Sequence, residues 1–140
     1  MRYDVVIIGA GAAGFACALT LGSANDKFDW AKDKKYLILD DNKSDLNVGK
    51  YFNVAGVDSG INGVDLLLKM KKQLEIYKDV ELKDEKATKI ENLGEYFKIT
   101  TENSTFEASI VVLATGLHKF DIECEGVNVK DNIFVPKPNN

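Results

Sequence analysis

The sequence is poor in residues on which several classes of protein depend. It has two cysteines and two prolines in 140 residues, and a single arginine, Arg2, among its 18 basic residues. Cys17 and Cys124 are too far apart in sequence for a Cys-x-x-Cys motif, so neither a disulfide framework nor a paired-thiol site is expected. The net charge of -4 and the lack of arginine disfavour nucleic-acid binding, which relies on basic surfaces and forked guanidinium groups.

Long hydrophobic runs are missing as well. The apolar runs are far shorter than the roughly 18 residues of a membrane-spanning helix, and no signal-peptide pattern opens the chain. Hydrophobic residues make up 45% of the chain and charged residues 29%, as in ordinary globular domains. We therefore expect a single domain over residues 1–140, in a soluble cytoplasmic protein that binds neither nucleic acid nor membrane.

The order of the apolar segments predicts an α/β fold. Two continuous apolar runs, residues 3–8 and 36–40, have the length of strands that are covered on both faces of a parallel sheet. The alanine-rich stretch 12–22 between them is typical of a helix that packs closely on such a sheet. A second helix is expected at 64–77, where an apolar stripe recurs at helical spacing, and Asn62 is suited to cap it.

The second half of the chain changes to an alternating pattern. After a short third strand at 80–82, three alternating segments are separated by turn signals, which predicts an antiparallel meander. These segments are residues 88–90, 96–100 and 104–107. Residues 109–114 are predicted to form a further, fully buried strand. We expect a Rossmann-like parallel sheet of the doubly wound kind, with the three-stranded meander as crossover and helices on both faces. Residues 116–140 are expected to form a tail, with one extra strand at 133–135.

A glycine motif of the form G-x-G-x-x-G follows the first predicted strand and opens the first predicted helix. In this context the first glycine permits a tight turn, the second lets the backbone approach a pyrophosphate, and the third lets the helix pack closely on the strand. The helix N-terminus would then present N–H groups to the pyrophosphate. The alternative is a glycine-rich turn that binds nothing. The motif consists of Gly9, Ala10, Gly11, Ala12, Ala13 and Gly14.

Asp40 ends the second predicted strand and is the candidate ribose ligand. A carboxylate there accepts hydrogen bonds from the two ribose hydroxyls and repels a 2′-phosphate. Asp40 lies 26 residues after Gly14, where about 20 is usual, and the polar stretch 22–35 accounts for the excess. Two alternatives remain open: Asp41 is the ligand instead, or Asp40 is an ordinary acid at a strand end.

Taken together, these segments resemble the first half of the FAD-binding domain of flavoprotein disulfide reductases of the thioredoxin reductase type. The resemblance covers residues 1–116. Residues 3–14 resemble the FAD fingerprint, 53–56 the Asn-aromatic-Pro-Gly loop, 61–66 the start of the next helix, and 109–116 the strand with its Ala-Thr-Gly end.

The resemblance implies FAD as the cofactor and assigns a place to each candidate residue. Residues 9–13 would meet the pyrophosphate, Asp40 the adenosine ribose, Asn53 the ribityl or flavin side, and the backbone of Lys86 and Ala87 the adenine, while Ala114, Thr115 and Gly116 would line the cofactor.

The departures from the family pattern concern the flavin half of the site and the redox centre. The Gly-Gly-Gln that helps hold the flavin ring has no match in residues 42–47. The sequence also shows no nicotinamide-binding domain, no redox Cys-x-x-Cys and no Gly-Asp segment. We therefore expect an oxidoreductase-like flavoprotein that is not a self-sufficient disulfide reductase. The alternatives are a non-catalytic module that binds FAD, NAD or an ADP-like nucleotide, and a subunit whose flavin site is completed by a second copy or another chain.

No residue is predicted to be catalytic or to bind a metal. Cys17 is expected in core packing, and His118 is expected at the surface. Cys124 lies between two glutamates, whose charges are expected to raise the pKa of its thiol.

Overall fold

The computed structural model describes residues 2–116 and 122–126. The described part contains two α-helices, two 3-10 turns and nine strands. The helices are α1 (Ala12–Asn25) and α2 (Gly63–Leu74), and the 3-10 turns are η1 (Asp29–Ala31) and η2 (Asp45–Val48). The strands are β1 (Arg2–Ile8), β2 (Tyr36–Asp40), β3 (Lys50–Tyr51), β4 (Ile61–Asn62), β5 (Val80–Asp84), β6 (Ala87–Asn92), β7 (Phe97–Thr101), β8 (Thr105–Leu113) and β9 (Glu123–Glu125).

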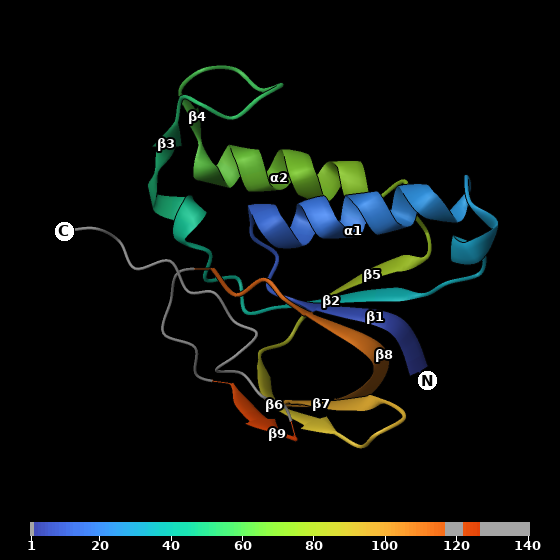
Figure 1. The fold of residues 1–140 in the computed structure, drawn as a ribbon. Coiled ribbons are helices and arrows are strands. Elements are labelled where there is room, and N and C mark those ends of the chain that lie inside the picture. The colour runs from blue at the N-terminus through green and yellow to red at the C-terminus, as the bar shows by residue number, and fades with distance from the viewer. Residues whose placement is uncertain (1, 117–121, 127–140) are drawn as a thin grey trace.

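The main sheet combines parallel and antiparallel strands in the order β5-β2-β1-β8-β7-β6-β9 (Figure 1). Strands β5, β2, β1 and β8 are parallel, whereas β8, β7 and β6 form an antiparallel meander. The predicted α/β class, with a parallel sheet and a three-stranded meander, is confirmed.

Two predictions about the segment that forms β8 were wrong. The sequence suggested separate strands at 104–107 and 109–114, but the structure has one strand, because no turn interrupts its alternation. Its first half pairs with β7 up to Ala108, and its pairing with β1 continues to Leu113. The strand is also not fully buried, since Ile110 is 55% exposed. β8 therefore joins the meander to the parallel sheet without a break.

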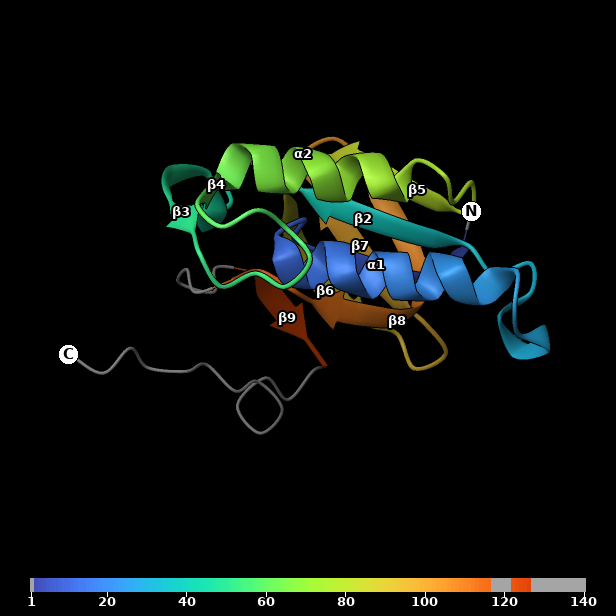
Figure 2. The ribbon, with the colours of Figure 1, turned by 90° about the horizontal axis from the view of Figure 1, so that it is seen from above.

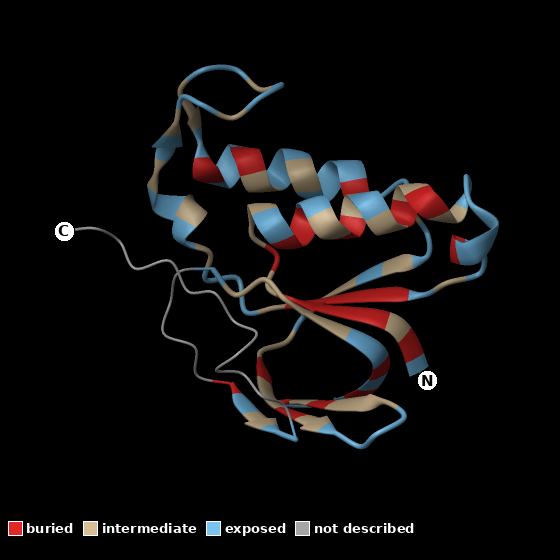
Figure 3. Cartoon of the chain, in the orientation of Figure 1, coloured by how far each residue is buried: buried red, intermediate tan, exposed pale blue. Residues whose placement is uncertain are grey.

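The two helices lie on the same face of the sheet, so the prediction of helices on both faces was wrong. Figures 1 and 2 show α1 and α2 side by side over β1 and β2, while the meander curls beneath the opposite face. Successive residues of β1 point to opposite faces. Val5 and Ile7 accordingly pack with the helices, and Val6 and Ile8 pack with Ile90 and other residues of the meander. The meander buries the face that a second layer of helices would otherwise cover, and Figure 3 shows β1 and β2 buried between the layers.

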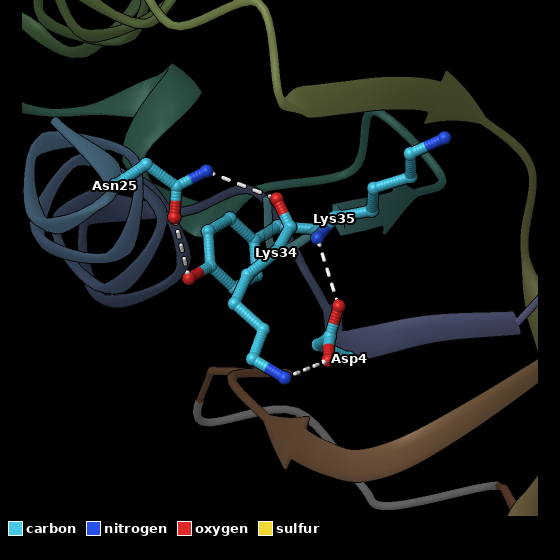
Figure 4. Close-up of polar contacts among 5 residues, drawn as sticks. Asp4, Asn25, Lys34 and Lys35 are labelled. Atoms are coloured by element: carbon cyan, nitrogen blue, oxygen red, sulfur yellow. Dashed lines mark hydrogen bonds and ion pairs between the residues drawn. The ribbon is translucent and has the colours of Figure 1, made fainter. Parts of the chain in front are cut away.

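The connection between α1 and β2 is longer than the sequence motif requires. Hydrogen bonds join its two ends to each other and to β1. Helix α1 continues to Asn25, three residues beyond its predicted end. The Asn25 side chain donates to the Lys34 carbonyl over 2.9 Å and accepts from the Tyr36 hydroxyl over 3.0 Å. Asp4 on β1 accepts from the Lys34 ammonium over 2.7 Å and from the Lys35 N–H over 2.9 Å (Figure 4). These contacts join the end of α1 and the start of β2 to each other and to β1.

Helix α2 begins at Gly63, one residue before its predicted start, and ends at Leu74, three residues before its predicted end. Asn62 caps it, with its Oδ1 accepting from the Asp65 N–H over 2.8 Å. No helix within residues 2–116 and 122–126 has the length and hydrophobicity needed to cross a membrane. A short strand, β9, pairs with β6 in the region predicted to be a tail. The strand predicted at 133–135 and His118 both lie outside the described residues.

Candidate nucleotide-binding site

The carboxyl ends of the parallel strands carry most of the candidate residues. In the sheet, Ile8 pairs with Leu39 and Leu113, and Asp40 pairs with Asp84, so β1, β2, β5 and β8 end along one edge. Asp40 is the last residue of β2, and the glycine motif and the segment 114–116 directly follow β1 and β8. In open α/β sheets, ligands bind outside this edge.

Gly9 and Gly14 allow backbone segments to pack closely at the turn between β1 and α1. Gly9 has φ +102°, and a Cβ at this position would collide with the Ala114 carbonyl. A Cβ at Gly14 would collide with the Gly9 carbonyl. The Ala114 N–H donates to the Ile8 carbonyl over 2.8 Å, which fixes the end of β8 beside the turn. These two glycines thus serve close packing, as the motif predicts.

Gly11 differs from the other two, because a Cβ at this position would not clash with the backbone. It is the N-cap residue of α1, with an ordinary φ of -76°, and no side chain caps the helix. A Cβ at Gly11 would meet the Ser44 Oγ at 3.6 Å, which is ordinary van der Waals contact. The N–H groups in the first turn of a helix have no acceptor within the helix. The arrangement is one in which an anionic group can approach the backbone.

Asp40 is held by the backbone on both sides. Its Oδ1 accepts from the Ala10 N–H over 2.8 Å, and its Oδ2 accepts from the Asn42 N–H over 3.1 Å. An ionised carboxylate offers about four lone-pair positions, so acceptor capacity remains for hydroxyl groups. Asp41 is exposed, and its Oδ1 accepts from the Lys43 N–H over 3.1 Å. Of the two acids, Asp40 is the one that the fold joins to the glycine motif.

The other candidates lie at varying positions around this edge. Lys86 lies in the connection between β5 and β6, two residues after Asp84, which pairs with Asp40, and Ala87 is buried at the start of β6. Thr115 and Gly116 follow β8, and Gly116 has φ +78°. Asn53 lies in the loop between β3 and β4 with an exposed side chain, and within the described residues no hydrogen bond joins it to the glycine motif.

Ser44 is a neighbour of the glycine motif that the sequence reasoning missed. Its Oγ faces Gly11 and also accepts from the Leu46 N–H over 3.3 Å, at the start of η2. A serine two residues before the N–H it binds is a recognisable local turn signal. The sequence could therefore have predicted the turn, but not its proximity to Gly11.

Two surface hollows, of about 440 and 400 Å³, lie elsewhere on the described part of the molecule. One is between α2 and the loop before β4, and the other is beside the connection from α1 to β2. No residue of the glycine motif lines either of them. These two hollows are therefore separate from the glycine motif.

Neither Cys17 nor Cys124 has the lowered pKa that is typical of a reactive thiol. Burial raises the pKa of the Cys17 thiol, which packs against the helix-side core as predicted. The pKa of Cys124 is raised too, as expected, but the cause is burial and not the neighbouring glutamates.

Comparison with known proteins places these features in a family context. The model of the family described as pyridine nucleotide-disulphide oxidoreductase matches residues 3–137. The thioredoxin reductase of Treponema pallidum (strain Nichols) is 32% identical over 114 residues, which are 81% of this chain and 35% of that protein.

Solved structures agree with this relationship. A thioredoxin reductase from Gloeobacter violaceus superposes with a TM-score of 0.73 and 28% identity, over 85% of this chain and 38% of its own. The thioredoxin reductase of Lactococcus lactis gives a TM-score of 0.70 and 32% identity, over 89% of this chain and 39% of its own. The chain thus spans little more than a third of the length of these relatives.

Proposed function

The chain belongs to the pyridine nucleotide-disulphide oxidoreductase family, and we propose that it binds the ADP half of FAD at the turn between β1 and α1. The observation that carries this proposal is Gly11 at a helix N-terminus without a side-chain cap, where a Cβ would make no clash, with Asp40 hydrogen-bonded to the adjacent Ala10. An anion-accepting backbone beside an oriented carboxylate suits a pyrophosphate joined to a ribose.

Each part of the ligand has a matching group on this edge. In the proposal, the backbone of residues 9–13 binds the pyrophosphate, and Asp40 accepts from the ribose hydroxyls. The family resemblance assigns the adenine to the backbone of Lys86 and Ala87, and the cofactor lining to residues 114–116. Asn53 is assigned to the ribityl or flavin side. Bound FAD supplies the electron-transfer chemistry, and this chain supplies binding and orientation.

A second candidate function is a binding subunit without a complete flavin site. One observation favours it: the segment 42–47, where the family resemblance would place Gly-Gly-Gln, leads instead into the short turn η2. Under this proposal, a second copy or a different chain completes the flavin side. The simplest form of this second candidate function is a module that binds only NAD or an ADP-like nucleotide.

Calorimetric titration with FAD, ADP, NAD and FMN tests the proposal. We expect FAD and ADP to bind with affinities within about tenfold of each other, because the ADP half makes the principal contacts. FMN lacks the adenosine and should not bind. Binding of FMN without binding of ADP would overturn the assignment of the site.

The flavin content of freshly purified protein then separates the two candidate functions. A yellow protein with stoichiometric FAD supports a flavoprotein. A colourless protein that binds ADP and NAD as tightly as FAD supports the nucleotide-binding module.

A further inference from the structure

The Ser44 side chain lies beside the glycine motif and has no role in the site as described so far. A Cβ added at Gly11 would lie 3.6 Å from the Ser44 Oγ, so this oxygen is no more than about 5 Å from the Gly11 Cα. Ser44 belongs to the connection from β2 to β3, shortly after Asp40, and it is half-buried. Its hydroxyl group is therefore brought to the N-terminus of α1 from a different part of the chain.

The O–H of Ser44 is available as a hydrogen-bond donor. The Ser44 Oγ accepts from the Leu46 N–H over 3.3 Å, and a hydroxyl group can accept and donate at the same time. Among residues 2–116 and 122–126, no acceptor takes its hydrogen. A negatively charged oxygen at this position would accept from it.

The turn that carries Ser44 is packed against α2 on its other side. The Leu46 carbonyl accepts from the Gly49 N–H over 3.3 Å. A Cβ at Gly63, the first residue of α2, would collide with the same carbonyl, so α2 begins in close contact with η2. The Gly63 N–H also donates to the Gly49 carbonyl over 2.9 Å. These contacts position Ser44 independently of the glycine motif.

A single phosphate oxygen can bond to the helix N-terminus and to Ser44 together. Hydrogen bonds of about 2.9 Å to a backbone nitrogen and about 2.7 Å to a hydroxyl oxygen join donors up to about 5.6 Å apart. The N–H groups in the first turn of α1 have no acceptor within the helix. Lys43 and Asp45 flank Ser44 with opposite charges, so the flanking side chains add no net charge beside the hydroxyl.

We infer that the Ser44 hydroxyl donates a hydrogen bond to the pyrophosphate at the glycine motif and is a ligand-binding residue of this site. This role requires a phosphate group at Gly11, and it therefore rests on the proposed function. Because the Ser44 oxygen also accepts from the Leu46 N–H, the bound pyrophosphate is linked through it to the start of η2.

Calorimetric titration of the full chain with ADP tests this role. Ser44→Ala removes the donor and should weaken ADP binding at least about tenfold, the lower end of the loss for a hydrogen bond to a charged group. Ser23→Ala is the matched control, because Ser23 lies in the last turn of α1, at the end away from Gly11. This control variant should bind ADP as tightly as the wild type does.

Two further variants separate the donor from the turn. Ser44→Thr keeps the hydroxyl and should bind ADP within about threefold of the wild type. Ser44→Asp keeps an acceptor for the Leu46 N–H but replaces the donor by a negative charge, so it should bind ADP less tightly than Ser44→Ala. If Ser44 acted only through the turn, Ser44→Asp would bind like the wild type and more tightly than Ser44→Ala. That order of affinities overturns the inference.

Hydrogen exchange at the Leu46 amide gives a readout that is independent of affinity. Saturating ADP should slow this exchange in the wild type, because the ligand fixes the hydroxyl that accepts from the Leu46 N–H. In Ser44→Ala, ADP at saturation should leave the exchange rate unchanged. Equal slowing in the two proteins would show that the link does not pass through Ser44.

The wild-type titration separates a failure of this role from a failure of the proposed function. A wild type that binds neither ADP nor FAD overturns both. A wild type that binds ADP, together with a Ser44→Ala variant of equal affinity, overturns the role of Ser44 alone.

Discussion

Asp40 Oδ1 accepts a hydrogen bond of 2.8 Å from the backbone N–H of Ala10, thirty residues earlier in the chain. The bond joins the end of β2 to the glycine motif after β1, in addition to the 2.8 Å bond from the Gly9 N–H to the Leu39 carbonyl. The carboxylate proposed to bind the ribose therefore also fixes the loop proposed to bind the pyrophosphate. A change at Asp40 should consequently affect both ligand affinity and folding stability.

The first prediction is that Asp40→Ala weakens binding of FAD and of ADP by about 1.5–3 kcal/mol, the range for hydrogen bonds to a charged group. Unfolding in urea should show a loss of about 1 kcal/mol from the bond to Ala10. Asp40→Asn retains an oxygen acceptor for Ala10 and should lose affinity with a smaller loss of stability.

Asp41→Ala is the matched control, because Asp41 is exposed and accepts a local hydrogen bond from the Lys43 N–H, two residues away. Asp41→Ala should change neither the affinity for FAD and ADP nor the stability in urea. Wild-type affinity of Asp40→Ala for FAD and ADP would remove Asp40 from the site, and reduced affinity of Asp41→Ala would put Asp41 in its place.

The second prediction concerns Gly11. Gly11→Val places a branched side chain where the ligand is proposed to meet the backbone, so nucleotide binding should fall below detection in the titration. Stability should change little, because the backbone there has an ordinary φ and a Cβ meets only the Ser44 Oγ at 3.6 Å. Normal binding by this variant would reduce the motif to a structural turn.

Gly14→Ala supplies the contrast. Its Cβ would collide with the Gly9 carbonyl, and neither backbone segment can move without disturbing the turn. A loss of stability of about 3 kcal/mol or more is expected. Circular dichroism during thermal unfolding distinguishes the two variants.

The features that the sequence predicted well are those encoded locally. The strand at Tyr36–Asp40 was predicted with its observed bounds, because an apolar run ends there on an acid. Asn62 was predicted as a cap, because capping depends on residues three positions apart. The turn of the glycine motif was predicted for the same reason, although the role of its residues in binding a cofactor remains a prediction.

The features that were missed depend on contacts between distant segments. Alternation along β8 shows its faces, but it does not show that the partner strand changes from β7 to β1 within one strand. The placement of both helices on one face follows from the meander covering the other face. The proximity of Ser44 to Gly11 likewise arises only once β2 lies beside β1.

The third prediction concerns the ion pair between Asp4 and Lys34 (Figure 4). Burial alone would raise the pKa of Asp4, but hydrogen bonds from Lys34 and Lys35 outweigh it and hold the pKa below its usual value. This contribution to stability is therefore present above about pH 4 and is lost as the pH falls through the lowered pKa.

Asp4→Asn should accordingly lower the melting temperature at neutral pH and reduce the difference in stability between neutral pH and about pH 2. Scanning calorimetry at a series of pH values measures both effects. Parallel pH profiles for wild type and variant would show that this pair contributes nothing to acid stability.

The fourth prediction concerns Tyr3, whose hydroxyl donates to Glu81 Oε2 over 2.6 Å. Burial, and after it the bond to Glu81, raises the pKa of Tyr3 to about 12. Since the folded pKa exceeds the ordinary value of about 10, this contribution to stability is complete below pH 10 and is lost as the pH rises towards 12.

Titration of phenolate absorbance, as a difference between wild type and Tyr3→Phe, isolates this group from the other tyrosines. In Glu81→Gln the pKa of Tyr3 should fall but stay above its ordinary value, because burial is the larger cause. Ionisation of Tyr3 near pH 10 in the wild type would contradict the burial argument.

The last prediction is that this 140-residue chain, supplied with FAD and a disulfide acceptor, does not sustain NADPH oxidation on its own. That reaction needs a nicotinamide site, a flavin and a thiol pair that passes electrons onward. The sequence has one G-x-G-x-x-G, already assigned to the flavin nucleotide, and Asp40 beside it would repel the 2′-phosphate of NADPH.

The thiols lead to the same expectation. Cys17 packs against the helix-side core and Cys124 against the meander-side core, so the sheet lies between them. Burial raises the pKa of both, which leaves little thiolate at neutral pH. The measurement is NADPH consumption above the rate with free FAD, in the wild type and in the double variant Cys17→Ser and Cys124→Ser. Turnover that the double variant abolishes would contradict the prediction. Turnover that requires a second protein would support the proposal of a split flavoprotein.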